Sequence, residues 1–283
     1  MHPVLFDFTV PLWGGSVVVY SMHVAIVLSA LIAIVLGTRA ARARQIEPSQ
    51  ALDVVLWTIL CVIAGARLYA VLEGPRAYIQ DPLKILKIWE GGLSTYGGFI
   101  GVAVGCVVCL RIKRIPMWRF MDAYVPYWFL GVAITRVGDF LNGTCYGAPV
   151  APPLGLAYPQ GSFPFNSHLA QGLIDAGASA SMPVHPTQLY SALMGLTIFT
   201  SLLLLSRRQR FDGQLTVVGG LLYGSIRFWI DFLRGDLAVR GPLDLSNTQW
   251  TGIALFCLCV VLYMHLWIRA IRDQGGYLHH YKP

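Results

Sequence analysis

The sequence predicts an all-α integral membrane protein with seven transmembrane helices and an outward-facing cap formed by long outer loops. The first reason is composition: 55% of the 283 residues are hydrophobic and only 12% are charged, which is too apolar for a soluble domain of this size. The second is spacing, because the apolar residues form seven segments near the length that crosses a bilayer. The third is that basic residues gather at the ends of these segments.

The seven predicted spans form one polytopic membrane domain, residues 1–283. The first span follows no basic stretch and precedes no small-residue cleavage site, so we expect it to remain as an anchor. The third span is short. The spans lie at residues 17–37, 52–72, 97–112, 120–141, 186–205, 215–234 and 249–268.

The basic residues predict the orientation in the membrane. With the N-terminus outside, the cytoplasmic loops carry thirteen Lys and Arg residues and the outer loops carry four. This is the positive-inside pattern, so we expect the C-terminus in the cytoplasm. Because the charges behind the formal net charge of +7 lie at helix ends and form no groove-sized basic face, they do not indicate a nucleic-acid partner.

Two outer segments are long enough to have structure of their own. Residues 73–96 are predicted to form an interfacial helix, in which Ile79 and Leu83 lie in the headgroup region and Lys84 snorkels. Residues 142–185 are rich in Pro, Gly and Ala, carry almost no charge, and are longer than an ordinary connection. Their aromatic residues favour a folded head, or cap, at the outer membrane surface.

The sixth span carries ionisable residues at membrane depth. At about 100° per residue, four of its side chains fall within roughly 80° on one face: Tyr223, Arg227, Asp231 and Arg234. Such residues usually face a bundle interior or a wet cavity and mark a binding site. Alternatively, Asp231 only neutralises Arg227 one turn away. Two arginines against one carboxylate favour the anion site.

The fourth span repeats this pattern near its outer end. Arg136 and Asp139 lie three residues apart, and Asn142 follows where the span gives way to the cap. A local ion pair would account for both charges without any function. Arg67, in the second span, has no carboxylate at helical spacing, and we expect it to snorkel outward.

Glycines surround Tyr96 at the outer mouth of the third span. Gly97 and Gly98 could let the backbone turn sharply or approach a ligand closely. The alternative is helix packing, because Gly97, Gly101 and Gly105 form a ladder of small residues. The sequence alone leaves the two interpretations equal.

Other polar residues are less specific by themselves. His185 and Gln188 begin the fifth span, and a lone His185 is typical of a structural histidine. Tyr20, in the outer half of the first span, is typical of an interfacial aromatic belt. Cys106 and Cys109 form a CxxC motif without a partner His or a second pair, so we expect neither a metal nor another cofactor.

Arginines from separate outer-side regions would meet at similar depth in this bundle. Arg136, Arg227 and Arg234 have Tyr, Asn and Gln residues nearby. Guanidinium groups bind phosphate oxygens bidentately, so such a cavity suits an anionic lipid headgroup whose acyl chains stay in the bilayer. The residues therefore predict a phospholipid site, but they do not name a reaction.

Five blocks of this sequence resemble the prolipoprotein diacylglyceryl transferases in order and spacing. They are YSMH, the run from GARLY to TYGGFIG, TRVGDFLNGTCYG, VHPTQLY and YGSIRFWIDFLRGD, which cover nearly the whole chain. The resemblance implies a seven-span enzyme of the bacterial cytoplasmic membrane. Such an enzyme moves the diacylglyceryl group of phosphatidylglycerol onto the lipobox cysteine of a prolipoprotein and releases glycerol phosphate.

The resemblance also implies roles for individual residues. The catalytic positions are Arg136, Arg227, Tyr96 and Asp139, with the two arginines stabilising the leaving phosphate. The substrate-binding positions are Tyr20, Gly97, Gly98, Asn142, His185, Gln188, Tyr223, Asp231 and Arg234.

At four positions within these blocks, the chain departs from the family pattern. Tyr96 stands where the family usually has His, Asp139 where it has Asn, and Thr144 and Asp231 where it has Glu. The departures leave two alternatives open. One is a divergent transferase with a different acceptor, and the other is a phospholipid-binding or transport relative without catalysis.

Overall fold

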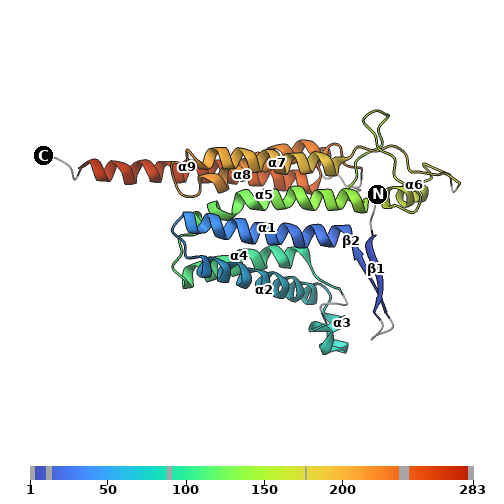
Figure 1. The fold of residues 1–283 in the computed structure, drawn as a ribbon, viewed down its shortest axis with the longest axis horizontal. Helices are drawn as coiled ribbons and strands as arrows, with labels where there is room; N and C mark the ends of the chain where they lie inside the picture. The colour runs from blue at the N-terminus through green and yellow to red at the C-terminus, as the bar shows by residue number, and fades with distance from the viewer. Residues whose placement is uncertain (1–3, 11–14, 88–90, 176, 236–241, 280–283) are drawn as a thin grey trace. The chain divides into compact units, whose positions relative to one another are not determined.

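The computed structural model describes residues 4–10, 15–87, 91–175, 177–235 and 242–279 (Figure 1). The chain divides into two compact units. The larger comprises Met1–Ala33 and Val125–Pro283, and the smaller comprises Ile34–Tyr124. Two helices, α1 (Ser21–Ala43) and α5 (Met117–Asn142), contribute residues to both units.

A β-hairpin precedes the first helix. β1 (Val4–Val10) pairs antiparallel with β2 (Gly15–Tyr20), and Val4 lies opposite Tyr20. The prediction of a helical span from residue 17 was therefore wrong at its start, because residues 17–20 are strand and α1 begins at Ser21. Three consecutive β-branched valines before Tyr20 favour a pleated strand over a helix. The fold is helical with this one hairpin added.

Each of the seven predicted spans overlaps a helix, but residues 17–20 of the first are strand and residues 232–234 of the sixth follow the end of their helix. Within the described residues, four helices are long and apolar enough to cross a membrane: α1, α2, α7 and the Asn247–Asp273 part of α9. Tyr96–Ile112 of α4 is a shorter apolar helix. The chain is thus a largely helical membrane protein. The bounds not yet given are α2 Pro48–Glu73, α4 Thr95–Ile112, α7 Thr187–Ser206, α8 Gln214–Asp231 and α9 Asn247–His279.

In the smaller unit, α2 and α4 pack together through glycines (Figure 1). A Cβ atom on Gly97 would collide with the carbonyl oxygen of Gly65, and one on Gly101 would collide with the backbone of Cys61. A Cβ on Gly105 would meet the Cys61 side chain. The packing interpretation of this glycine ladder is therefore confirmed, because only a missing side chain allows the two backbones to come so close.

Arg67 fastens a loop to α2 in the same unit. Its side chain is buried, and its guanidinium donates hydrogen bonds to the carbonyl oxygens of Lys84, Ile85, Lys87, Gly91 and Gly92. The guanidinium carbon also lies 5.2 Å from the ring centroid of Tyr78. The expectation that Arg67 snorkels outward was wrong, since backbone carbonyls satisfy its donors inside the protein.

The predicted interfacial helix over residues 73–96 is two short helices in the structure. They are α3 (Pro75–Gln80) and the 3-10 helix η1 (Pro82–Ile85). Pro82 cannot donate its backbone N–H, so it favours a new start over continuation of α3. Ile79 and Leu83 are exposed, as an interfacial position requires. Residues 88–90 of this segment lie outside the described residues.

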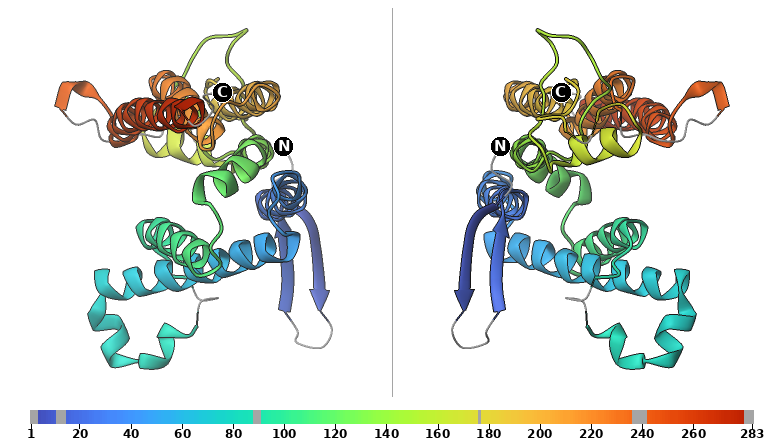
Figure 2. Two further views of the ribbon diagram at one scale, coloured as in Figure 1. Left: turned by 90° about the vertical axis from the view of Figure 1, so that its left-hand side faces the viewer. Right: turned by 90° about the vertical axis from the view of Figure 1, so that its right-hand side faces the viewer.

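The larger unit is a bundle in which α5, α7, α8 and α9 lie side by side (Figures 1 and 2). α8 packs against both α7 and α9. Gly219 of α8 lies against α5 and α7, where a Cβ atom would come within 2.9 Å of the Phe129 ring. The apolar core of the bundle consists of Phe129, Met194, Ile198, Leu202, Leu215 and Ile230.

The segment between α5 and α7 is folded. It contains α6 (Phe163–Ala170), whose N-cap Ser162 accepts a hydrogen bond from the backbone N–H of Phe165. Tyr146, Tyr158 and Val184 form a buried cluster. Backbone bridges join Val184 to Pro149 and to Leu156, and Pro159 to Ala180. The described residues of 142–175 and 177–185 are therefore folded, and their position as a cap on the outer side stays a prediction.

The glycine packing predicts a difference between two nearby substitutions. We expect Gly101→Ala to destabilise the protein by about 1–3 kcal/mol, because its Cβ meets backbone atoms that have no room to move. Gly98→Ala is the matched control in the same helix, since its Cβ would lie 3.8 Å from Val62, an ordinary contact. Thermal unfolding of the purified protein measures both, and equal melting temperatures would contradict the packing account.

The buried His168 predicts a dependence of stability on pH. Burial lowers the pKa of His168, and its Nδ1 has no hydrogen-bond partner within the described residues. Just below the unfolded pKa of His168, its imidazole therefore binds a proton in the unfolded chain but not in the folded chain. Stability is full above the unfolded pKa of about 6.5 and falls as the pH drops below it.

We therefore expect the melting temperature of the wild type to fall more steeply on acidification than that of His168→Gln. The exposed His23 offers a matched control substitution, His23→Gln. Thermal unfolding measured on either side of the unfolded pKa tests this. A His168→Gln slope as steep as that of the wild type would show that His168 does not titrate on unfolding.

Candidate functional site

The last turn of α5 presents an ion pair. Nη1 of Arg136 lies 2.9 Å from Oδ2 of Asp139, at the i,i+3 spacing. The hydroxyl of Thr144 donates to the other carboxylate oxygen at 3.3 Å. Asn142, the last residue of α5, approaches Sδ of Met22 at 4.0 Å. The local pairing that the sequence left open is present here, and Asp139 accepts from two donors.

A second ion pair lies on α8. Nη2 of Arg227 is 2.7 Å from Oδ1 of Asp231, and the two side chains are 8% and 0% exposed. Although this distance is short, neither carboxylate oxygen has a hydrogen bond of acceptable geometry within the described residues. The two groups still attract each other strongly, because charge attraction depends on separation much more than on angle. Asp231 is therefore a buried carboxylate held mainly by charge.

Arg234 does not lie on the helical face predicted for it. α8 ends at Asp231, three residues before the predicted end of the span. Arg234 instead forms an antiparallel bridge with Gly147, and the backbone N–H of Ala148 donates to the carbonyl of Leu233 at 2.8 Å. Backbone pairing, and not helical periodicity, brings Arg234 back toward the end of α5.

The three arginines share one electrostatic neighbourhood. The charges of Arg136 and Arg234 both act on Arg227 and both act on Asp139. Tyr223 also acts on Arg227 from one turn earlier in α8. Three guanidinium groups therefore lie near enough to two carboxylates for their charges to interact, and their convergence on one phosphate stays a prediction.

The start of α7 holds the loop that follows α5. The hydroxyl of Thr187 donates to the carbonyl of Cys145 at 2.8 Å, and Nε2 of Gln188 donates to the carbonyl of Thr144 at 2.7 Å. Nε2 of Gln188 also donates to the hydroxyl oxygen of Tyr158 at 3.1 Å. Thr187 and Tyr158 were missed from the sequence, because both contacts join residues far apart in the chain. A Thr at the first turn of a helix was the one available signal.

His185 has mainly structural contacts. Its backbone carbonyl accepts from the N–H of Gly147 at 2.9 Å, and its Nδ1 lies 3.3 Å from the hydroxyl of Tyr190. These contacts agree with the interpretation of His185 as a structural histidine. Its predicted role in substrate binding stays a prediction.

The other sequence-predicted residues are Tyr20 in the larger unit and Tyr96, Gly97 and Gly98 in the smaller one. Tyr20 ends β2, is 40% exposed, and packs edge-on against His23. Tyr96, Gly97 and Gly98 lie in the first turn of α4, in the smaller unit. Tyr96 is 69% exposed, with its ring centroid 6.2 Å from that of Tyr69.

The arginine neighbourhood has the chemistry of an anion site. Arg136, Arg227 and Arg234 against Asp139 and Asp231 give a formal charge of +1 for this set. Guanidinium groups can exchange a carboxylate partner for a phosphate, since both accept two parallel N–H bonds. Within the described residues there is no group of three or more His, Cys, Asp or Glu placed to hold a metal ion.

Comparison with known proteins identifies the family. The family model of the prolipoprotein diacylglyceryl transferases matches residues 8–265. A protein of Thermosynechococcus vestitus is 34% identical over 224 residues, 78% of this chain and 80% of its own. One of a Nostoc species is 31% identical over 264 residues, 89% of each chain. One of Cupriavidus metallidurans is 30% identical over 262 residues, 91% of this chain and 84% of its own.

Each of the three relatives is named phosphatidylglycerol–prolipoprotein diacylglyceryl transferase. The match extends across α5 and α8, the helices that carry both ion pairs, and across the loop that α7 holds in place. The chain therefore belongs to the prolipoprotein diacylglyceryl transferase family.

Proposed function

We propose that this protein transfers the diacylglyceryl group of phosphatidylglycerol to the lipobox cysteine thiol of a prolipoprotein and releases glycerol phosphate. The names of its relatives and its family membership support the reaction. The observation that carries it is the neighbourhood of Arg136, Arg227 and Arg234, because this reaction moves negative charge onto a phosphate.

The arginines suit the chemical step. The cysteine thiol loses its proton to the solvent, and the resulting thiolate attacks the glyceryl carbon that bears the phosphate. A C–S bond forms, and the C–O bond to phosphate breaks. The phosphodiester then leaves as a monoester with additional negative charge. Arg136 and Arg227 stabilise this charge more in the transition state than in the substrate, which is how binding energy accelerates a step. The positive surroundings also favour the thiolate form of the attacking cysteine.

The remaining residues of the larger unit have supporting roles in this proposal. Asp231 and Arg234 complete the charged network around Arg227. Tyr223 and Asn142 position the headgroup, and Tyr20 belongs to the same substrate-binding set. His185 and Gln188 act through the loop that they hold, since their described hydrogen bonds go to the protein itself.

Tyr96 and Asp139 bear on the acceptor. Tyr96 takes the motif position where the family usually has His, and Gly97 and Gly98 beside it shape the headgroup entrance. Asp139 pairs with Arg136, so it reduces the positive charge that Arg136 offers to the phosphate. These two departures favour a variant of the same reaction, in which the diacylglyceryl group is transferred to a nucleophile other than a lipobox cysteine.

The proposal includes a membrane arrangement. The chain spans the bacterial cytoplasmic membrane seven times as one domain, with the N-terminus outside and the C-terminus in the cytoplasm. Residues 142–185 form a cap on the outer side. The distribution of Lys and Arg between the loops supports this orientation.

One observation favours a second function, binding or transport of phospholipid without catalysis. Arg136 and Arg227 are each paired with a carboxylate on their own helix. A site neutralised in this way could hold a headgroup without driving bond cleavage. Turnover that depends on Arg227 would exclude this function.

The reaction predicts a strong effect of Arg227. We expect Arg227→Gln to lower kcat by about 100-fold or more, the loss typical when one donor to a developing oxyanion is removed. Arg207→Gln is the control, because Arg207 is exposed and follows α7 at the other end of the bundle. The assay follows glycerol phosphate release and mass gain of a lipobox peptide in phosphatidylglycerol vesicles. If the wild type gives neither product, the transferase proposal is wrong.

The pairing of Arg136 predicts a gain of substrate affinity in one variant. Asp139→Asn removes the carboxylate from Arg136 and leaves a side chain of similar shape. We expect the KM for phosphatidylglycerol to fall several-fold, on the order of one charge-assisted hydrogen bond, with little change in kcat. The same assay reports both constants. A collapse of kcat in Asp139→Asn would instead assign Asp139 a part in proton transfer.

A further inference from the structure

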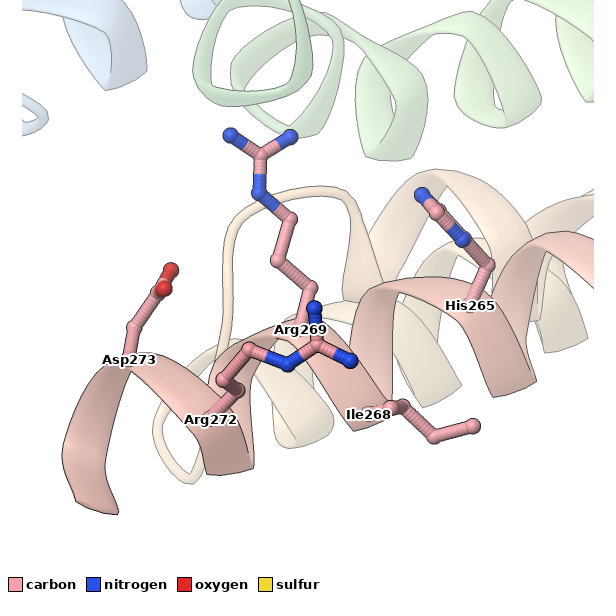
Figure 3. A pocket seen from close by; sticks show the side chains of 5 residues that line it. All are labelled: His265, Ile268, Arg269, Arg272 and Asp273. Atoms are coloured by element: carbon pink, nitrogen blue, oxygen red, sulfur yellow. The ribbon is translucent and has the colours of Figure 1, made fainter. Parts of the chain in front are cut away.

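The C-terminal part of α9 carries a basic hollow. Five side chains on successive turns line it: His265, Ile268, Arg269, Arg272 and Asp273 (Figure 3). Arg269 and Arg272 lie three residues apart, so their guanidinium groups leave the same side of the helix. All five residues are exposed.

This hollow is far from the arginines of the candidate site. Nε2 of Gln249 donates to the carbonyl of Phe228 at 3.3 Å, which places the start of α9 beside Arg227. Arg269 comes twenty residues after Gln249, and at 1.5 Å per residue this is about 30 Å along the helix. About 30 Å is the thickness of the hydrocarbon core of a bilayer. The two basic places therefore lie at opposite ends of the bundle.

A second basic element packs against the same part of α9. The guanidinium carbon of Arg210 lies 5.6 Å from the ring centroid of Trp267. Phe211 packs edge-on against Tyr263 and Trp267, with ring centroids 5.5 and 6.0 Å apart. These contacts hold the turn between α7 and α8, which also carries the exposed Arg207 and Arg208, against the face of α9 that bears Tyr263 and Trp267. At about 100° per residue, this face is roughly opposite the one that bears Arg269 and Arg272.

The cations of the hollow are available to a ligand. Within the described part of the chain, neither Arg269 nor Arg272 has a hydrogen bond or an ion pair. Asp273 is the acidic member of the lining, and Figure 3 shows Arg272 extending away from it. The lining of the hollow therefore has two guanidinium groups and one imidazole, and its one carboxylate is that of Asp273.

We propose that this hollow is a second anion site, which binds the phosphate group of a ligand at the membrane face opposite the Arg227 site. Guanidinium groups bracket phosphate oxygens with paired N–H bonds. An anionic phospholipid headgroup is the source that the surroundings favour, because Ile268 and the apolar length of α9 adjoin the cations. Free inorganic phosphate has the same chemistry and is the other source.

Modification of arginines with phenylglyoxal, mapped by mass spectrometry, tests the site in the intact protein. The protein is placed in vesicles of phosphatidylcholine, in vesicles of phosphatidylcholine with phosphatidylglycerol, and in phosphatidylcholine vesicles with inorganic phosphate. Arg207 and Arg208 are internal controls, since they are exposed on the neighbouring turn but do not line the hollow.

We expect phosphatidylglycerol to slow modification of Arg269 and Arg272 about tenfold relative to Arg207 and Arg208. Asp273→Asn should increase this protection, because it removes the competing carboxylate. Protection in the phosphatidylglycerol vesicles alone assigns the site to a lipid headgroup, and protection by inorganic phosphate as well assigns it to phosphate in general.

Equal protection of all four arginines would overturn the proposal, because it would mean only a general attraction between a basic surface and an anionic membrane. Absence of protection would overturn it as well. Neither result bears on transfer from phosphatidylglycerol, which is measured separately through Arg227.

Discussion

A guanidinium group at membrane depth has to find its partners within the protein, and this constraint explains the placement of three arginines here. Arg67 donates to a cage of backbone carbonyl oxygens. Arg136 and Arg227 each take a carboxylate from the same helix, three and four residues further on. The difference decides their chemistry. Carbonyl oxygens belong to the backbone and cannot be exchanged without unfolding the loop, whereas a carboxylate side chain can give way to a phosphate.

The two ion pairs therefore combine two properties that a lipid headgroup site needs. A buried ion pair orients the guanidinium group before any ligand arrives, and it keeps an isolated charge out of the low-dielectric interior. The α7 residues add rigidity, because Thr187 and Gln188 fix the backbone directly after α5. Asp139 accepts from both Arg136 and Thr144, so a carboxylate of the same helix is the partner of Arg136 in this structure.

Short-range features of this structure could be predicted from the sequence, and long-range ones could not. Apolar runs located the helices, and spacings of three and four residues indicated the ion pairs as an alternative to a free anion site. The N-terminal hairpin was missed because Val-rich strand and apolar helix have the same hydropathy and adjoin without a break. Arg67 was misjudged because its acceptors lie 17 to 25 residues away on the backbone, where no side-chain pattern shows them. Arg234 was placed on α8 because periodicity alone does not reveal where a helix stops.

The backbone bonds of residues 147 and 148 restrict how a lipid can exchange with this bundle. Gly147 donates to the carbonyl of His185 just before α7, and Ala148 donates to that of Leu233 just after α8. Residues 147 and 148 thus link the start of α7 to the end of α8 through backbone hydrogen bonds. Separation of α7 from α8 at this end would have to break both of these hydrogen bonds, so opening between these two helices is restricted by the backbone itself.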